Sequence, residues 1–238
     1  MKIVSVNVGL PREVVWKGIT VQTAIFKTPV AGAVAIRELN LAGDQQADLT
    51  VHGGSEKAVY GYPAEHYEYW LKQLSDVSLS WGAFGENLTT EGLREDTLYI
   101  GDVLKVGSAV LQITQPRMPC YKLELRFNRD DMIKRFLVSG RSGFYFSVIE
   151  QGDVAAGSKV EILDRDPDGV TVSDIVRLYL GQTRDPELLQ RARSVGSLPH
   201  NWKTQLLLRA QNQVSNPWSS ASGLSGRTVG DSYIVLIR

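Results

Sequence analysis

Turn residues divide the first two thirds of the chain into pieces too short for long helices. Up to about residue 165, short apolar segments alternate with glycine-containing turns, and the whole chain holds 22 glycines. Several of these segments alternate in polarity, and in SAVLQIT the side chains of Ala109, Leu111 and Ile113 fall on one face of a strand. Many short strands between turns predict a mainly β chain, folded as a barrel or a compact mixed sheet.

Two patterns locate the expected turns. VVWKGITV predicts two strands joined at Lys17-Gly18. In GFYFSVIEQGDVAAGSKVEIL, turns are expected at Gln151-Gly152-Asp153 and at Gly157-Ser158. The strands of this region are therefore expected to follow one another through tight connections.

One segment with helical periodicity interrupts the strands at residues 63–74. Its apolar residues recur at helical spacing on one side, at Tyr67, Trp70, Leu71 and Leu74. Pro63 suits the first helical position, where its missing N–H costs nothing. The sequence predicts an amphipathic helix here.

A second helical segment is expected at residues 120–140. Its apolar residues recur at near-helical intervals, at Leu123, Phe127, Met132 and Phe136, and Gly140 closes the segment. Cys120 then lies where a strand ending near Thr114 meets this helix. Functional side chains are often presented from such junctions.

The pattern changes after DRDPDGV, the charged turn at residues 164–170. Three helices are expected beyond it: one with Ser173 as N-cap and Gly181 as its stop, one starting at an Asp-Pro pair, and one after Pro199. The prediction is a β-barrel domain at 1–166, a small three-helix unit at 170–215 and a tail at 216–238. The tail ends in SYIVLIR, which either packs back on the barrel as a strand or serves a partner chain.

Charge and hydropathy exclude several classes of protein. The 26 basic residues balance the 26 acidic ones, so no net field favours direct binding to nucleic acid or to an anionic membrane. The apolar run at the N-terminus is too short for a signal peptide, and no stretch reaches the roughly 18 apolar residues of a membrane span. With a single cysteine, an internal disulfide is impossible. We expect a cytoplasmic protein without a membrane partner.

That one cysteine, Cys120, lies in QPRMPCYKL. A lone cysteine is often only a small buried hydrophobic residue. Here, however, Pro116 and Pro119 restrict the backbone, while Arg117 and Lys122 favour the thiolate over the thiol. A rigid loop with an electropositive thiolate is typical of a nucleophile or a metal ligand.

The histidines limit what such a thiolate can do. A cysteine nucleophile in a hydrolase needs a histidine base, and the candidates are His52, His66 and His200. His66 falls in the first expected helix and His200 in the three-helix unit, which leaves His52. Neither C-x-x-C nor H-x-x-x-H spacing occurs, so the sequence offers no closed zinc site.

Two polar segments are candidate walls of a binding site. In VHGGSEK, the amides of Gly53 and Gly54 are able to cradle an anion that Lys57 also contacts, unless His52 simply closes a turn. In WGAFGENLTTEGL, Asn87 either hydrogen-bonds a planar, polar heterocycle or caps an ordinary polar loop. Both alternatives stay open at this point.

Taken together, these segments resemble a known family. LAGDQQADLTVHGGSEKAVYGYPAEHYEYW, GAFGENLTTEGL, GDVLKVGSAVLQITQPRMPCYKL and GRSGFYFSVIEQG have the order and spacing of a MOSC domain, which is also found at the C-terminus of molybdenum-cofactor sulfurases. The likeness covers about residues 1–215 and is greatest to the bacterial YiiM type, whose small 3-alpha domain resembles the expected three-helix unit. It implies a MOSC-type β-barrel with a few helices that binds the molybdenum cofactor.

The resemblance also implies an activity and roles for individual residues. YiiM-type proteins reduce N-hydroxylated compounds such as 6-hydroxylaminopurine, a detoxifying reaction that is independent of pyridoxal phosphate and draws electrons from a separate reductase. Cys120 corresponds to the family's metal-binding and catalytic cysteine. The residues expected around the cofactor are His52, Gly53, Gly54, Lys57, Glu86, Asn87, Thr89 and Arg117. Ser147 stands where many relatives have a basic residue, while Asp102 is expected to support a turn.

Other functions remain possible from the sequence. Cys120 is able to carry a persulfide, or to hand cofactor to another enzyme, and the barrel with its three helices is also compatible with a non-catalytic docking module. No G-x-G-x-x-G signature for a flavin or nicotinamide follows a strand, which is consistent with electrons that arrive from a separate protein. Both a monomer and a homodimer are compatible with the sequence.

Overall fold

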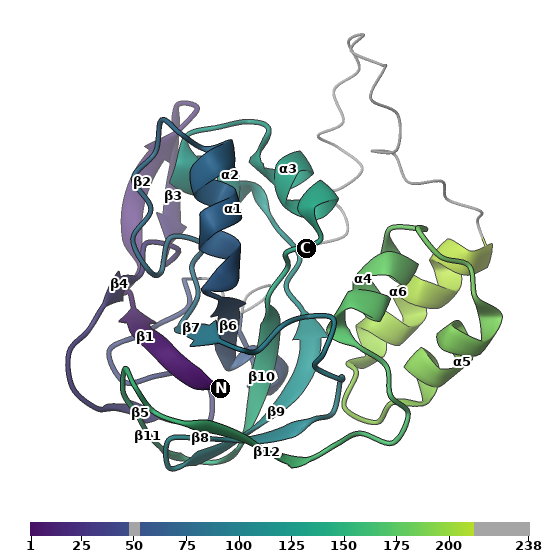
Figure 1. Cartoon of the computed structure of the whole chain (residues 1–238). Helices are drawn as coiled ribbons and strands as arrows, with labels where there is room; N and C mark the ends of the chain where they lie inside the picture. The colour runs from purple at the N-terminus through teal and green to yellow at the C-terminus, as the bar shows by residue number, and fades with distance from the viewer. Residues whose placement is uncertain (48–52, 212–238) are drawn as a thin grey trace, which may run out of the picture.

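The structure, a computed structural model, describes residues 1–47 and 53–211 and is mainly β (Figure 1). One sheet has eight strands in the order β12-β8-β9-β10-β6-β7-β1-β4, in which all neighbours are antiparallel except β6 and β7. Its strands are β1 (Lys2–Val8), β4 (Thr28–Pro29), β6 (Val59–Pro63), β7 (Leu88–Glu91), β8 (Val103–Val106), β9 (Ala109–Pro116), β10 (Phe144–Glu150) and β12 (Val160–Asp164). The prediction of a mainly β fold with a few helices is confirmed.

The sheet curves until strands far apart in its order meet. The amide of Val160 on β12 donates to the carbonyl of Met1 at 3.0 Å, and the amide of Ile3 on β1 donates to Ser158 at 2.9 Å. Inside the curve, Ala109, Leu111 and Ile113 of β9 are fully buried, as their alternation predicts. Backbone groups that an open edge would leave unpaired are thereby satisfied.

A separate hairpin, β2 (Arg12–Trp16) with β3 (Ile19–Thr23), stands beside the sheet. Its two-residue turn has Lys17 at φ 49° and Gly18 at φ 79°, the left-handed conformations that a type I′ hairpin turn requires. The predicted turn at Lys17-Gly18 is confirmed.

The expected turn at residues 151–153 is wrong, although the one at Gly157-Ser158 is present. Gly152 begins a strand, β11 (Gly152–Val154), which pairs with β5 (Val34–Ile36). A Cβ atom at Gly152 would lie 2.5 Å from the backbone nitrogen of Ala109. This glycine therefore allows two backbones to approach closely instead of making a turn.

The first helix, α1 (Glu65–Gln73), starts later than expected. Pro63 is the last residue of β6, opposite Thr90 of β7, so it ends a strand and does not begin the helix. Tyr67, Trp70 and Leu74 are buried as predicted, whereas Leu71 is 50% exposed because it lies on the outer side of the helix.

The single helix expected at 120–140 is two helices, α2 (Tyr121–Phe127) and α3 (Met132–Ser139). Asn128 takes a left-handed conformation, φ 50°, and its amide donates to carbonyls of the last turn of α2, which ends that helix. Gly140 ends α3, as predicted. The predicted apolar residues still meet in one aromatic cluster with Trp70 and Phe84, namely Leu123, Phe127, Met132 and Phe136.

Three helices follow β12 and pack beside the sheet: α4 (Val172–Tyr179), α5 (Pro186–Ser194) and α6 (His200–Gln211). The N-cap of α4 is Thr171 and not Ser173, because the Thr171 hydroxyl and the Asp174 carboxylate form a reciprocal capping box. Asp185 caps α5 with Pro186 at its first position, as predicted. The boundary at 166–170 stays a prediction, and the tail at 216–238 lies outside the described residues.

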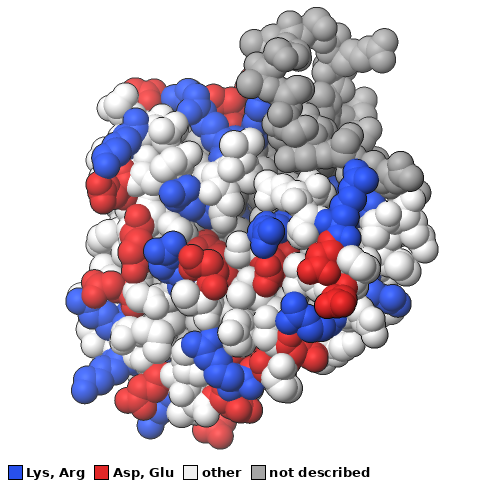
Figure 2. All heavy atoms as spheres, turned by 45° about the vertical axis from the view of Figure 1, so that its right-hand side comes forward, with Lys and Arg blue, Asp and Glu red and all other residues white. Residues whose placement is uncertain are grey.

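The three helices share one apolar core with the sheet. Ile175, Leu188 and Trp202 belong to the same buried cluster as Leu111 of β9. On the face shown in Figure 2, basic and acidic side chains are interspersed, as the balanced composition leads one to expect. Over the described residues, no helix combines the length and apolar character needed to cross a bilayer.

Candidate active site around Cys120

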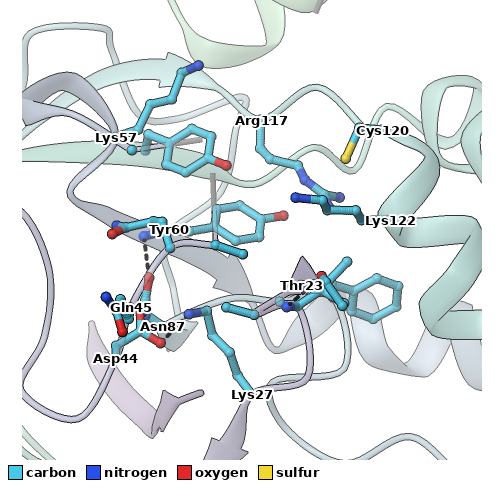
Figure 3. Close-up of a pocket in the computed structure, with 18 of the residues that line it drawn as sticks. Thr23, Lys27, Asp44, Gln45, Lys57, Tyr60, Asn87, Arg117, Cys120 and Lys122 are labelled. Carbon is cyan, nitrogen blue, oxygen red and sulfur yellow. Dashed lines mark hydrogen bonds and ion pairs between the residues drawn. The ribbon is translucent and has the colours of Figure 1, made fainter. Parts of the chain in front are cut away.

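One pocket brings together segments that lie far apart in the sequence (Figure 3). Its walls come from the end of β3 and the loop after it, residues 44–47, the 3-10 turn η1 (Ser55–Lys57) with Gly53, the segment around Asn87, and the loop from β9 to α2. In Figure 3 the sulfur of Cys120 and the guanidinium of Arg117 lie toward one end, while Asp44 and Asn87 lie toward the other.

Five of the predicted site residues line this pocket, namely Gly53, Lys57, Asn87, Arg117 and Cys120. Gly54 precedes η1 with φ 85° and is not part of the lining. Glu86 and Thr89 are fully buried beside the pocket without lining it. His52 lies outside the described residues.

Cys120 is the residue directly before α2, with extended backbone angles of φ −127° and ψ 174°. Its position confirms the predicted junction, although β9 runs on to Pro116. The side chain is 9% exposed and still borders the pocket, so the thiol is shielded from bulk water yet reachable by a bound group. This combination suits a ligand to a bound metal better than a freely exposed nucleophile.

Arg117 is the second distinctive group of the pocket. It is 6% exposed, and its guanidinium carbon lies 5.0 Å from the ring centre of Phe136 and 5.5 Å from that of Tyr60. Its Nη1 atom is buried and finds no hydrogen-bond acceptor in residues 1–47 and 53–211. A buried donor of this kind is costly unless a ligand pairs with it. The pocket therefore offers a preformed contact for an anion.

Two further cations flank this pair. Lys57 lines the pocket from η1, and Lys122 lines it from the first turn of α2. Burial lowers the pKa of Lys57, an effect that the Glu56 carboxylate and Cys120 oppose. An anion bound beside Lys57 would favour its charged form.

The opposite end of the pocket is built on a buried ion pair that the sequence analysis missed. Lys27 pairs with Asp44, and their side chains are 9% and 1% exposed. Asn87 donates from Nδ2 to Asp44 at 2.9 Å and accepts from the amide of Tyr60 at 3.1 Å. Burial lowers the pKa of Lys27, while Asp44 opposes that shift. Asn87 thus has a polar role at the wall, but the group it binds in this structure is Asp44.

No sequence signal pairs Lys27 with Asp44. The two residues lie in irregular segments and belong to no motif, so only the tertiary fold shows that they are partners. A weak hint is that Lys27 follows Ile25-Phe26 directly, where a charged side chain among apolar ones needs a partner.

Glu86 and Thr89 support the pocket from behind. The Glu86 carboxylate accepts hydrogen bonds from the hydroxyl of Tyr67, the amides of Gly82 and Phe84 at 2.8 and 3.1 Å, and the hydroxyl of Thr89 at 2.9 Å. Burial raises the pKa of Glu86, although the hydrogen bonds from Tyr67, Gly82 and Thr89 oppose the shift. This carboxylate holds the turn that carries Phe84 against the pocket.

The sequence and the fold match a known family. A MOSC-domain model matches residues 48–161. The chain is also 38% identical over 182 residues to protein YiiM of Escherichia coli (strain K12), an alignment that covers 76% of this chain and 81% of the relative.

The chain belongs to the MOSC-domain family. Within it, the chain is of the YiiM type, since the structure superimposes on the crystal structure of YiiM from Geobacillus stearothermophilus with a TM-score of 0.72. That comparison covers 88% of this chain and 98% of the other, at 32% identity. A third relative, named Reductase, comes from Gibberella moniliformis (strain M3125 / FGSC 7600). It is 35% identical over 152 residues, which are 61% of this chain and only 26% of that longer protein.

The MOSC pocket fits the molybdenum cofactor that the family name implies. Among the described residues, no three His, Cys, Asp or Glu side chains converge to hold a metal ion by themselves. A metal beside Cys120 must therefore bring ligands of its own, and this cofactor does so. The lining supplies one thiol, that of Cys120, and four cationic side chains against a single carboxylate, which suits an anionic group with a metal.

Proposed function

We propose that the protein is a molybdenum-cofactor-dependent reductase of N-hydroxylated compounds, including N-hydroxylated nucleobases such as 6-hydroxylaminopurine. The observation that carries this proposal is the thiol of Cys120 in the same pocket as the buried, unpaired Nη1 of Arg117. A thiolate suits the metal, and the free guanidinium donor suits an anionic part of the cofactor. The relative named Reductase supports an oxidoreductase.

When bound, the cofactor would supply two-electron redox chemistry, while the chain binds and orients it. Cys120 would give one thiolate to the metal, and Arg117, Lys57 and Lys122 would neutralise the anionic charge around it. The carbons and rings of Met118, Tyr60 and Tyr145 also line the pocket and limit the entry of water.

The proposed reaction converts N–OH to N–H. The N–O bond breaks, the oxygen leaves as water, and two electrons and two protons enter for each molecule reduced. A separate reductase supplies the electrons, because the sequence carries no recognisable flavin or nicotinamide signature.

The test compares the parent protein with Cys120→Ser, both expressed in a host that makes the cofactor. Molybdenum is measured by elemental analysis and pterin by fluorescence after oxidation, and reduction of 6-hydroxylaminopurine is followed with a chemical electron donor. Met118→Leu is the matched control, since it removes the other sulfur that lines the pocket. We expect metal and activity in the parent and the control, and loss of activity with altered or lost metal in Cys120→Ser.

Other outcomes decide against this function. Full activity in Cys120→Ser would exclude the thiolate as a required ligand. If neither metal nor pterin accompanies the parent protein, a sulfur or cofactor carrier becomes the better hypothesis, and the mass of one extra sulfur atom on Cys120 would support it. A docking module would bind its partner equally well with serine at this position.

A further inference from the structure

A buried hydrogen bond joins α6 to the strand that leads into the Cys120 loop. The indole Nε1 of Trp202 donates to Oε1 of Gln115 at 2.7 Å. Both side chains are buried, at 6% and 2% exposure. Gln115 is the second-last residue of β9, so this contact links α6 to the strand that leads into the pocket wall at Arg117.

The other end of the same amide holds the turn that carries Lys57. Nε2 of Gln115 donates to the carbonyl of Glu56 at 3.1 Å. An indole N–H only donates and a backbone carbonyl only accepts, so the two partners together permit a single orientation of the amide. Trp202 thereby fixes the oxygen end of Gln115 and holds its Nε2 end toward η1.

The Glu56 carbonyl is tied to β9 twice. Besides Gln115, the hydroxyl of Thr114 donates to it at 2.7 Å. One residue further on, Lys57 lines the pocket, and its amide closes η1 by donating to Gly54 at 3.0 Å. The position of this carbonyl therefore sets the position of the Lys57 backbone.

We propose that Trp202 is a positioning residue for the pocket: acting through Gln115, it holds η1 and Lys57 in place, so that α6 forms part of the functional site. The effect of this positioning on ligand binding rests on the proposed function, whereas the coupling between Trp202 and η1 does not. A second contact links the same regions, because Met118 of the pocket wall packs against the apolar cluster that Val176 and Leu180 of the α4 segment form with Leu137.

The test replaces Trp202 by phenylalanine, which keeps an aromatic ring and removes the N–H. The Gln115 oxygen then loses its partner in a buried place, and the amide is held only by its hydrogen bond to the Glu56 carbonyl. Hydrogen exchange of the Lys57 amide, followed by NMR, should accelerate by about five- to tenfold, the factor that corresponds to one net hydrogen bond. Trp70→Phe is the matched control, since Trp70 also donates a buried indole N–H, to Tyr62 at 2.6 Å, away from η1.

A double variant shows whether Trp202 acts through Gln115. In a Gln115→Met background, the Trp202→Phe change should add less than about twofold to exchange at Lys57, because the coupling is already gone. An equal acceleration in Trp70→Phe and Trp202→Phe, or an undiminished effect in the Gln115→Met background, would overturn the proposal.

The binding consequence is measured separately, with pyrophosphate as an anionic probe. If the parent binds pyrophosphate, Trp202→Phe should raise its dissociation constant several-fold while Trp70→Phe leaves it nearly unchanged, and equal affinities would contradict the positioning role. If the parent does not bind this probe and carries no cofactor, the proposed function fails, while hydrogen exchange still decides the coupling.

Discussion

Replacing Lys27 by methionine should destabilise the protein strongly, because Lys27 is the only cation paired with Asp44 among the described residues. After the change, Asp44 keeps its hydrogen bonds from the Gly9 amide at 2.8 Å and from Asn87 at 2.9 Å, but its charge stays buried without a counter-charge. Removing one partner of a buried pair typically costs about 3–5 kcal/mol. Out of a total stability of about 5–15 kcal/mol, this is a large fraction.

Urea unfolding followed by circular dichroism measures the effect. With an m-value of about 2–3 kcal/mol/M, the midpoint should fall by roughly 1–2 M. The matched control is Lys2→Met, which breaks a pair between Lys2 and Glu91 at 3.2 Å whose side chains are 52% and 54% exposed. Breaking such an exposed pair should cost less than about 1 kcal/mol.

The double variant Lys27→Met/Asp44→Asn separates charge from packing. Without the carboxylate no buried charge is left unpaired, so this variant should be more stable than Lys27→Met alone. The reasoning is refuted if Lys27→Met costs no more than Lys2→Met, or if removing the carboxylate brings no recovery.

Two further predictions concern pH and the anion contact. Burial raises the pKa of four tyrosines in the folded protein, namely Tyr60, Tyr62, Tyr67 and Tyr145. Between pH 10 and 11 these side chains therefore lose their protons first in the unfolded state, so the free energy of unfolding falls. At pH 11 each contributes a loss of about 1.4 kcal/mol, and Lys27 and Lys57, whose pKa values burial lowers, oppose this as two groups against four. Tyrosinate absorbance should therefore rise together with unfolding, and ionisation of all the tyrosines in the folded protein would contradict this. Arg117→Met should reduce molybdenum content at least tenfold, because it removes the buried Nη1 donor that is free for a ligand. It should also lower the stability of the cofactor-free protein, because the guanidinium contacts with the rings of Tyr60 and Phe136 are lost. Elemental analysis and urea unfolding check both effects, and unchanged metal content would contradict the assigned role.

The local predictions that succeeded rest on interactions between residues close in sequence. The alternation in β9, the turn at Lys17-Gly18 and the cap at Asp185 each depend on a few neighbouring residues. The failures occurred where a distant part of the chain competes with the local preference. Gly152 looks like a turn residue, but the nearby backbone of Ala109 requires a glycine there.

The candidate site divides in the same way. Cys120 was predictable because its chemistry and its two flanking prolines are written in one short segment, and that segment resembles a known family. The family resemblance implied that Glu86 lies around the cofactor, yet its carboxylate accepts hydrogen bonds from four donors of the protein. Burial and hydrogen-bond partners, which the sequence does not display, make this difference.

The sequence by itself determined the strand-rich pattern, the three C-terminal helices and the position of the one thiol at the start of a helix, since each follows from periodicity, turn residues and side-chain chemistry. Only the tertiary structure decided that Lys27 meets Asp44, that the Arg117 Nη1 atom is left for a ligand, and that Trp202 reaches Gln115, 87 residues away. Such pairs form because the chain folds back on itself and excludes water around polar groups, and those groups must then find partners wherever the fold has placed them.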